Sequence, residues 1–210
     1  LGLLHREPVP DLDPAYHQLS PADFDTEFQT GVFYIGKDQA SLGEIIDALE
    51  QTYCGSIGAE IMHIVDTEQR QWIQKRMDGV RSSPEFNLDT KRHLLERLTA
   101  AEGLEKYLGS RYPGTKRFGL EGGESTLVAL NTLLYQGIGN GVEEIVMGMA
   151  HRGRLNVLAN FLQKPLSVLF NEFSENYVPD LVCGDGDVKY HLGYETRREI
   201  EGASVNIFLA

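Results

Sequence analysis

The 210-residue sequence has few cysteines and no long apolar run. Cys54 and Cys183 lie far apart, so they form neither a disulfide framework nor the close spacing of a metal site. A reducing, intracellular setting is therefore expected. No stretch reaches the roughly 18 apolar residues of a membrane span. Residues 1–14 also do not have the basic and apolar regions of a signal peptide. We expect no membrane association.

Basic residues are scarce as well. The sequence has 19 Lys and Arg against 31 Asp and Glu, which gives a formal net charge of −12. A nucleic-acid surface needs clustered cations to neutralise phosphates, and the one local pair, Arg197-Arg198, is too short for that. Nucleic acid is therefore not expected as a partner. The composition, 41% hydrophobic and 24% charged, is typical of a globular protein.

The N-terminal half is predicted to be mainly helical. Residues 1–38 are rich in Pro, Asp and Gly, and we expect an extended arm there. Residues 39–112 are expected to form a small helical module, because their apolar positions recur at helical spacing. The elements expected in this module are a helix from Leu42 to Tyr53, a short strand over 58–65, a helix that opens at an Asp66 cap, and a longer helix through Leu94 and Leu108.

Residues 113–210 are predicted to begin an open α/β domain. An apolar strand over 143–150 is followed by a polar turn and then by an apolar helical run over 155–162. In such sheets ligands bind beyond the carboxyl ends of the strands. Residues 194–210 are expected to form two more strands. Because the chain begins without Met and stops in an apolar, strand-like run, we expect it to be an internal piece whose α/β domain is incomplete.

The polar turn after the first of these strands is the strongest candidate site. His151, Arg152 and Arg154 place one imidazole and two guanidiniums at the end of a strand in an acidic protein. Guanidiniums bind phosphates and carboxylates through two parallel N–H groups, and an imidazole can relay a proton near neutral pH. Alternatively, His151 satisfies a buried carbonyl and the two arginines pair with some of the excess carboxylates.

Two further segments carry weaker signals. The Gly-Asp repeat at 184–187 has neither the further ligands nor the late Glu of a calcium loop, so we predict no metal site in this chain. Lys189, Tyr190 and His191 are expected to line a polar pocket, with a plain surface turn as the alternative. The glycines of 117–125 do not follow a dinucleotide-binding pattern, and close packing explains them better than an anion loop.

Six runs of sequence carry a resemblance to a known family. They are LGL (1–3), QTYCGSIGAEIMHI (51–64), LTAAEGLEKYLG (98–109), KRFGLEGGE (116–124), VMGMAHRGRLNVLANFL (146–162) and GDVKYHLG (186–193). Together they follow the family's order along nearly the whole chain. The sequence resembles the first component of 2-oxoglutarate dehydrogenase complexes, a thiamine-diphosphate-dependent decarboxylase.

The resemblance implies an N-terminal portion of a longer subunit, with a helical region followed by the opening of the thiamine-diphosphate-binding domain. The family enzyme is a homodimer of the citric acid cycle. It decarboxylates 2-oxoglutarate and passes the succinyl group to the lipoyl domain of a dihydrolipoyl succinyltransferase. It uses thiamine diphosphate and Mg²⁺, with the metal ligands expected outside this chain, so the fragment alone should be inactive. The expected location is the bacterial cytoplasm, or the mitochondrial matrix if a transit peptide has been removed.

The resemblance also implies roles for individual residues. His151 matches a catalytic histidine near the substrate, and Arg152 matches a cofactor-contacting position. The residues implied for the substrate pocket are Arg154, Lys189, Tyr190 and His191. Two alternatives stay open. One is a relative that prefers 2-oxoadipate, because a single methylene contributes only ~1–3 kcal/mol of discrimination. The other is a non-catalytic fragment that serves assembly or interaction.

Overall fold

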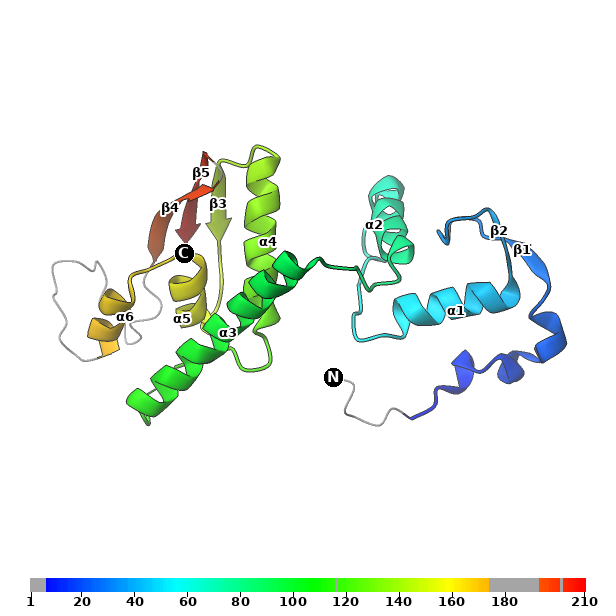
Figure 1. Ribbon diagram of the computed structural model, residues 1–210, viewed down its shortest axis with the longest axis horizontal. Coiled ribbons are helices and arrows are strands. Elements are labelled where there is room, and N and C mark those ends of the chain that lie inside the picture. Colours follow the sequence, from blue (N-terminus) through cyan, green and yellow to red (C-terminus); the bar gives the residue numbers. More distant parts are fainter. Residues whose placement is uncertain (1–6, 116, 174–192, 201) are drawn as a thin grey trace. The chain divides into compact units, whose positions relative to one another are not determined.

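The computed structural model describes residues 7–115, 117–173, 193–200 and 202–210. They belong to two compact units, Leu1–Phe86 and Asn87–Ala210, which are described separately (Figure 1). Both units mix helix and sheet, in agreement with the predicted α/β class. In the described part of the chain, no helix is both long enough and apolar enough to cross a membrane.

The first unit contains short 3₁₀ turns, a two-stranded sheet and two helices. Its elements are η1 (Pro10–Leu12), η2 (Pro14–His17), η3 (Pro21–Asp23), β1 (Glu27–Gln29), β2 (Gln39–Ser41), α1 (Leu42–Tyr53) and α2 (Thr67–Gly79). The strands β1 and β2 pair antiparallel. No residue of η1, η2 or η3 is buried, so this stretch contributes little to a core.

Side-chain caps fix the starts of both helices of the first unit. The Ser41 hydroxyl accepts a hydrogen bond from the Glu44 N–H (3.3 Å), and the Glu44 carboxylate accepts one from the Ser41 N–H (3.0 Å). The Asp66 carboxylate accepts one from the Gln69 N–H (3.0 Å). Each cap satisfies N–H groups that have no partner inside the helix. The helix from Leu42 to Tyr53 and the cap at Asp66 are thus confirmed.

The predicted strand over 58–65 is wrong. The segment has no regular secondary structure, and Met62 and Val65 are 78% and 92% exposed. A strand needs a neighbour for its backbone hydrogen bonds. In the described residues of this unit, the sheet consists of β1 and β2 only. The apolar side chains of the segment therefore belong neither to a strand of a sheet nor to a buried core.

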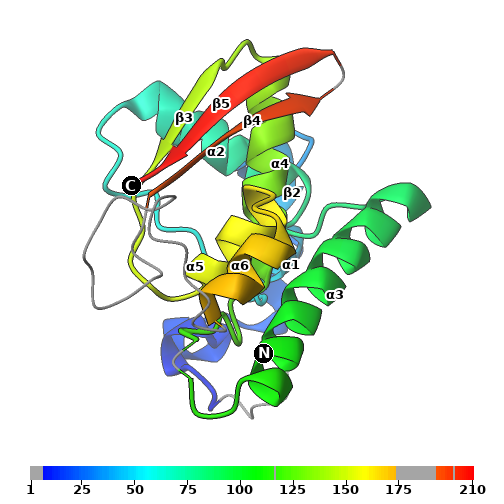
Figure 2. The ribbon, with the colours of Figure 1, turned by 90° about the vertical axis from the view of Figure 1, so that its left-hand side faces the viewer.

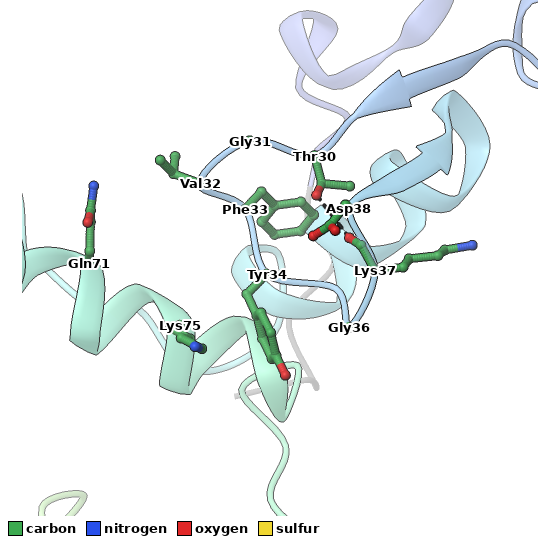
Figure 3. Close-up of a pocket in the computed structure, with 10 residues that line it drawn as sticks. All are labelled: Thr30, Gly31, Val32, Phe33, Tyr34, Gly36, Lys37, Asp38, Gln71 and Lys75. Atoms are coloured by element: carbon green, nitrogen blue, oxygen red, sulfur yellow. Dashed lines mark hydrogen bonds between the residues drawn. The ribbon is translucent and has the colours of Figure 1, made fainter.

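A buried carboxylate holds the first unit together. Asp78 of α2 is 1% exposed, and its carboxylate accepts hydrogen bonds from the Tyr34 N–H (3.1 Å) and the Tyr53 hydroxyl (2.8 Å). It therefore ties α2 both to α1 and to the loop between β1 and β2. This loop and α2 line a cavity of about 460 Å³, in which Lys75 lies over the Tyr34 ring at 5.0 Å (Figure 3).

The Tyr53 hydroxyl makes the first unit sensitive to alkaline pH. Burial, followed by the hydrogen bond and charge of Asp78, raises the pKa of Tyr53 to about 12. An unfolded tyrosine titrates near pH ~10. Because the folded pKa is the higher one, the stabilisation is complete below pH ~10 and is lost as the pH rises towards ~12. The free energy of unfolding, followed by Trp72 fluorescence, should fall over this range.

Two substitutions test this pH dependence. Tyr53→Phe removes the titrating hydroxyl, so the variant should lose less stability than the wild type between these two pH values. Tyr16→Phe is the matched control, because Tyr16 is 64% exposed. Equal slopes for the wild type and Tyr53→Phe would contradict the assignment.

The second unit combines a three-stranded sheet with helices. Its elements are α3 (Leu88–Arg111), α4 (Ser125–Gly139), β3 (Glu144–Met147), α5 (Arg154–Asn156), the π-helix η4 (Val157–Phe161), α6 (Leu166–Phe173), β4 (Tyr194–Ile200) and β5 (Ala203–Leu209). The strand order is β3-β5-β4, with β5 parallel to β3 and antiparallel to β4 (Figure 2). The predicted strand after residue 143 and the two predicted C-terminal strands are confirmed.

The core of the second unit lies between one face of the sheet and the helices. It is formed by residues of β5 and of α3, α4 and η4, which include Val205, Ile207, Leu209, Ala101, Leu127, Leu134, Val157, Leu158 and Phe161. Along β3, exposed and half-buried residues alternate, and Val146 is 70% exposed. The run of 143–150 is apolar without alternation, which predicts a buried strand as in a parallel sheet. In the described residues, the core covers only one face.

The long helix α3 belongs to the second unit. Ala101 lies in the core shared with α4 and η4, and Leu108 packs against Leu155 of α5. The unit therefore begins at Asn87. The sequence had placed the start of the α/β domain later, at residue 113, because the helical periodicity of α3 does not reveal which neighbour the helix packs against.

Candidate functional site

The candidate site is the turn between β3 and α5. The Gly153 N–H donates to the Phe118 oxygen (2.7 Å), and the Arg154 N–H donates to the His151 oxygen (3.1 Å). Gly153 has a φ of +73°, a backbone angle that residues other than glycine rarely adopt. A Cβ at this position would also run into the Leu120 side chain. The turn therefore follows a strand end, as predicted, and its shape depends on glycine.

Arg152 presents its guanidinium at the surface of this turn. The side chain is exposed, and Nη2 donates to the main-chain oxygen of Glu121 (2.8 Å). A guanidinium carries five N–H donors, so this bond uses only one of them. The contact holds Arg152 against the segment that precedes α4.

His151 is exposed beside it. The centroid of its imidazole ring lies 4.3 Å from that of the Phe118 ring, with a tilt of 38° between the ring planes. Phe118 thus touches the turn twice, through this ring and through its main-chain oxygen. The ring contact orients the imidazole without burying it.

Arg154 has a different environment from its two neighbours. The residue is 1% exposed, and burial lowers the pKa of its guanidinium. Nη1 donates to the main-chain oxygen of Met149 (3.2 Å), and Nη2 donates to that of Ala210 (2.9 Å). Met149 follows β3 and Ala210 follows β5, so Arg154 joins the carboxyl ends of the two parallel strands. The sequence predicted an anionic ligand or a carboxylate as the partner of Arg154, whereas these two partners are main-chain oxygens.

Two buried polar residues next to the turn were missed by the sequence reasoning. Glu105 of α3 accepts hydrogen bonds from the Leu120 N–H (3.0 Å) and from the Asn156 side chain (2.9 Å). Asn156 is fully buried at the end of α5. A signal did exist, because Glu105 lies four residues after Ala101 and therefore on the same helix face. Asn156 likewise interrupts a mostly apolar run, as Asn160 does.

Not all predicted site residues can be placed. Lys189, Tyr190 and His191 lie outside the described residues, as does the Gly-Asp repeat at 184–187. Within the described ranges, no group of three His, Cys, Asp or Glu side chains could hold a metal ion. Gly119 bears on the glycines of 117–125, because a Cβ there would lie 2.6 Å from the Glu105 Oε2 atom. Close packing at this glycine agrees with the sequence reasoning.

Similarity to known proteins extends along the whole chain. The 2-oxoglutarate dehydrogenase E1 component of Azotobacter vinelandii is 50% identical over 210 residues, which are all of this chain and 22% of that protein. The chain is homologous to part of the 2-oxoglutarate dehydrogenase E1 component. The family resemblance seen in the sequence is thereby confirmed.

Two other E1 components show the same pattern. That of Cupriavidus necator is 50% identical over 205 residues, which are 98% of this chain and 21% of the relative. That of Brucella anthropi is 44% identical over 201 residues, which are 95% and 20% of the two chains. The chain thus spans about a fifth of the length of these E1 relatives. No family model matches the sequence.

Proposed function

We propose that this chain is the part of a 2-oxoglutarate dehydrogenase E1 component in which the thiamine-diphosphate-binding domain begins. The observation that carries the proposal is the 50% identity to such a protein along all 210 residues. The position of the turn supports it, because ligands of open α/β sheets bind beyond the carboxyl ends of the strands. His151 and Arg152 are exposed at this position, after β3.

The exposed groups of the turn suit anionic ligands. Thiamine diphosphate carries a diphosphate, and 2-oxoglutarate carries two carboxylates. In this proposal the Arg152 guanidinium binds the diphosphate, since its planar N–H groups match phosphate oxygens. The His151 imidazole faces the substrate, where it donates a hydrogen bond or moves a proton. The bound cofactor supplies the electron sink for decarboxylation.

The remaining roles follow from the same assignment. The proposed protein is a homodimer of the citric acid cycle in bacterial cytoplasm, and it passes the succinyl group to the lipoyl domain of a dihydrolipoyl succinyltransferase. The ligands of its Mg²⁺ are proposed to lie outside this chain. The substrate pocket is proposed to include Lys189, Tyr190 and His191. Arg154 contributes through the strand ends that it joins.

Replacing Arg152 by lysine tests the proposal in the intact protein. Lysine keeps the positive charge and loses the planar pair of donors, so the affinity for thiamine diphosphate should fall about 10-fold. The measurement is a titration of the protein with cofactor, followed by fluorescence quenching.

The matched control is Arg92→Lys. Arg92 lies on α3 with a side chain that is 76% exposed, and its replacement should leave the affinity unchanged. If Arg152→Lys binds the cofactor as tightly as the wild type, Arg152 does not hold the diphosphate.

Turnover of 2-oxoadipate in preference to 2-oxoglutarate would identify the longer substrate instead.

A further inference from the structure

Glu105 is a buried carboxylate that takes part in no ion pair within the described residues. It is 9% exposed, and its Oε1 atom accepts both the Leu120 N–H (3.0 Å) and the Asn156 Nδ2 (2.9 Å). An ionised carboxylate is costly to bury unless N–H donors or cations surround it. The two donors come from different segments, so the carboxylate links them.

The first linked segment, 118–121, holds the site turn. The Phe118 oxygen accepts the Gly153 N–H, and its ring contacts His151. The Glu121 oxygen accepts a hydrogen bond from the Arg152 guanidinium. Glu105 therefore binds this segment at the Leu120 N–H. Leu120 lies between Phe118, which contacts the imidazole, and Glu121, which binds the guanidinium.

The second linked segment is α5, which directly follows the turn. Asn156 is fully buried, and its Nδ2 donates to the Ala101 oxygen (2.9 Å) as well as to Glu105. Its Oδ1 accepts a hydrogen bond from the Asn160 Nδ2 (2.6 Å). Asn156 thus fixes the end of α5 on α3, and the Glu105 carboxylate contacts both the segment that the turn packs against and the helix that follows the turn.

Gly119 gives independent evidence that this arrangement is closely fitted. A Cβ at Gly119 would run into Oε2 of Glu121 and would lie 2.6 Å from Oε2 of Glu105, which is closer than real Cβ contacts come. The second carboxylate oxygen of Glu105 therefore occupies, together with the Glu121 carboxylate, the space that a side chain would take. Oε1 of Glu105 accepts the Leu120 N–H, and Oε2 lies beside Gly119 of the same segment.

We propose that Glu105 is a positioning residue for the site. Its carboxylate sets segment 118–121 relative to α5, and this sets the His151 ring and the Arg152 guanidinium. Geometry and not charge is what the role requires, because both partners are neutral N–H donors. The effect on a ligand rests on the proposed function, whereas the effect on the turn does not.

Three variants of the intact protein separate positioning from general stability. Glu105→Leu keeps most of the volume and removes both acceptor oxygens, whereas Glu105→Gln keeps an acceptor oxygen. Glu102→Leu is the matched control, because Glu102 lies on the same helix with a side chain that is 58% exposed and pairs with Lys106.

Amide hydrogen exchange at Leu120 and Gly153 is the readout that a merely structural role would not single out. Glu105→Leu should speed exchange at both amides about 10-fold, because a buried donor loses its acceptor and the turn loses its support. Exchange in α4 and β5 should stay as in the wild type. Glu105→Gln and Glu102→Leu should match the wild type at both amides. A uniform rise throughout the second unit, or a rise at Leu120 without one at Gly153, would overturn the proposal.

Titration with thiamine diphosphate then connects the turn to the ligand. Glu105→Leu should weaken cofactor binding about 10-fold, with recovery in Glu105→Gln. Unchanged affinity, despite faster exchange at both amides, would show that the position of the turn does not matter for binding and would overturn that part. If the wild type does not bind the cofactor, the proposed function fails, and the exchange data alone decide whether Glu105 positions the turn.

Discussion

Replacing His151 by alanine is expected to slow decarboxylation of 2-oxoglutarate by about 10²–10⁴-fold, the usual loss for a positioned acid–base group. The imidazole is exposed after β3 and is oriented by the Phe118 ring, and in the proposed function it faces the substrate and not the diphosphate. Its loss should therefore leave the affinity for thiamine diphosphate unchanged. Single-turnover kinetics of the intact protein, beside a cofactor titration, measure the two effects separately.

A second substitution distinguishes the imidazole's chemistry from its packing. His151→Phe keeps an aromatic ring against Phe118 and has no ring N–H, so it should be as slow as His151→Ala. His63→Ala is the control, because His63 is an exposed residue of the first unit. Wild-type rates in both His151 variants would show that the turn is only structural, and the assignment of His151 would then be abandoned.

Replacing Arg154 by methionine is expected to destabilise the second unit by about 3–5 kcal/mol, since each hydrogen bond from a charged donor contributes ~1.5–3 kcal/mol. Methionine fills much of the same space, but it leaves the main-chain oxygens of Met149 and Ala210 without these donors. Urea unfolding, followed by hydrogen exchange in peptides from β3 and β5, measures the loss.

Arg152→Met is the matched control for this loss. It is the same substitution two residues away, at an exposed side chain with a single described hydrogen bond. Its cost should be within ~1 kcal/mol, as for most surface substitutions. Arg154→Lys should fall between the two, because an ammonium group can reach one of the two oxygens. Equal losses in Arg154→Met and Arg152→Met would show that the strand ends do not depend on Arg154.

Periodicity and caps made parts of this fold predictable. The helix from Leu42 to Tyr53 and the cap at Asp66 follow from local spacing, and β3 with its polar turn follows from an apolar run next to His151 and Arg152. Such features depend on near neighbours in the chain. The strand expected over 58–65 failed because a strand also needs a partner, which its own residues do not specify.

The residue types of the candidate site were predictable from the sequence, but the burial of their side chains was not. His151, Arg152 and Arg154 look alike in the sequence as cationic groups of one turn, and the structure buries only Arg154. Burial depends on where β5 lies, because an oxygen beyond its end is one of the partners of Arg154. Glu105 illustrates the same limit, since its partners follow it by 15 and 51 residues.

The place of β5 in the middle of the sheet has a consequence for how the protein is made on the ribosome. β3 pairs with β5, and β5 is synthesised several seconds later at ~5–20 residues per second. Until then, the core residues of α4 and η4 have no sheet to cover them. The β4–β5 pairing is local, and hairpins form within ~1–10 μs, so β5 can pair with β4 before it pairs with β3. Because Arg154 also donates to the Ala210 oxygen, the turn with His151 and Arg152 completes its contacts only after β5 has been synthesised.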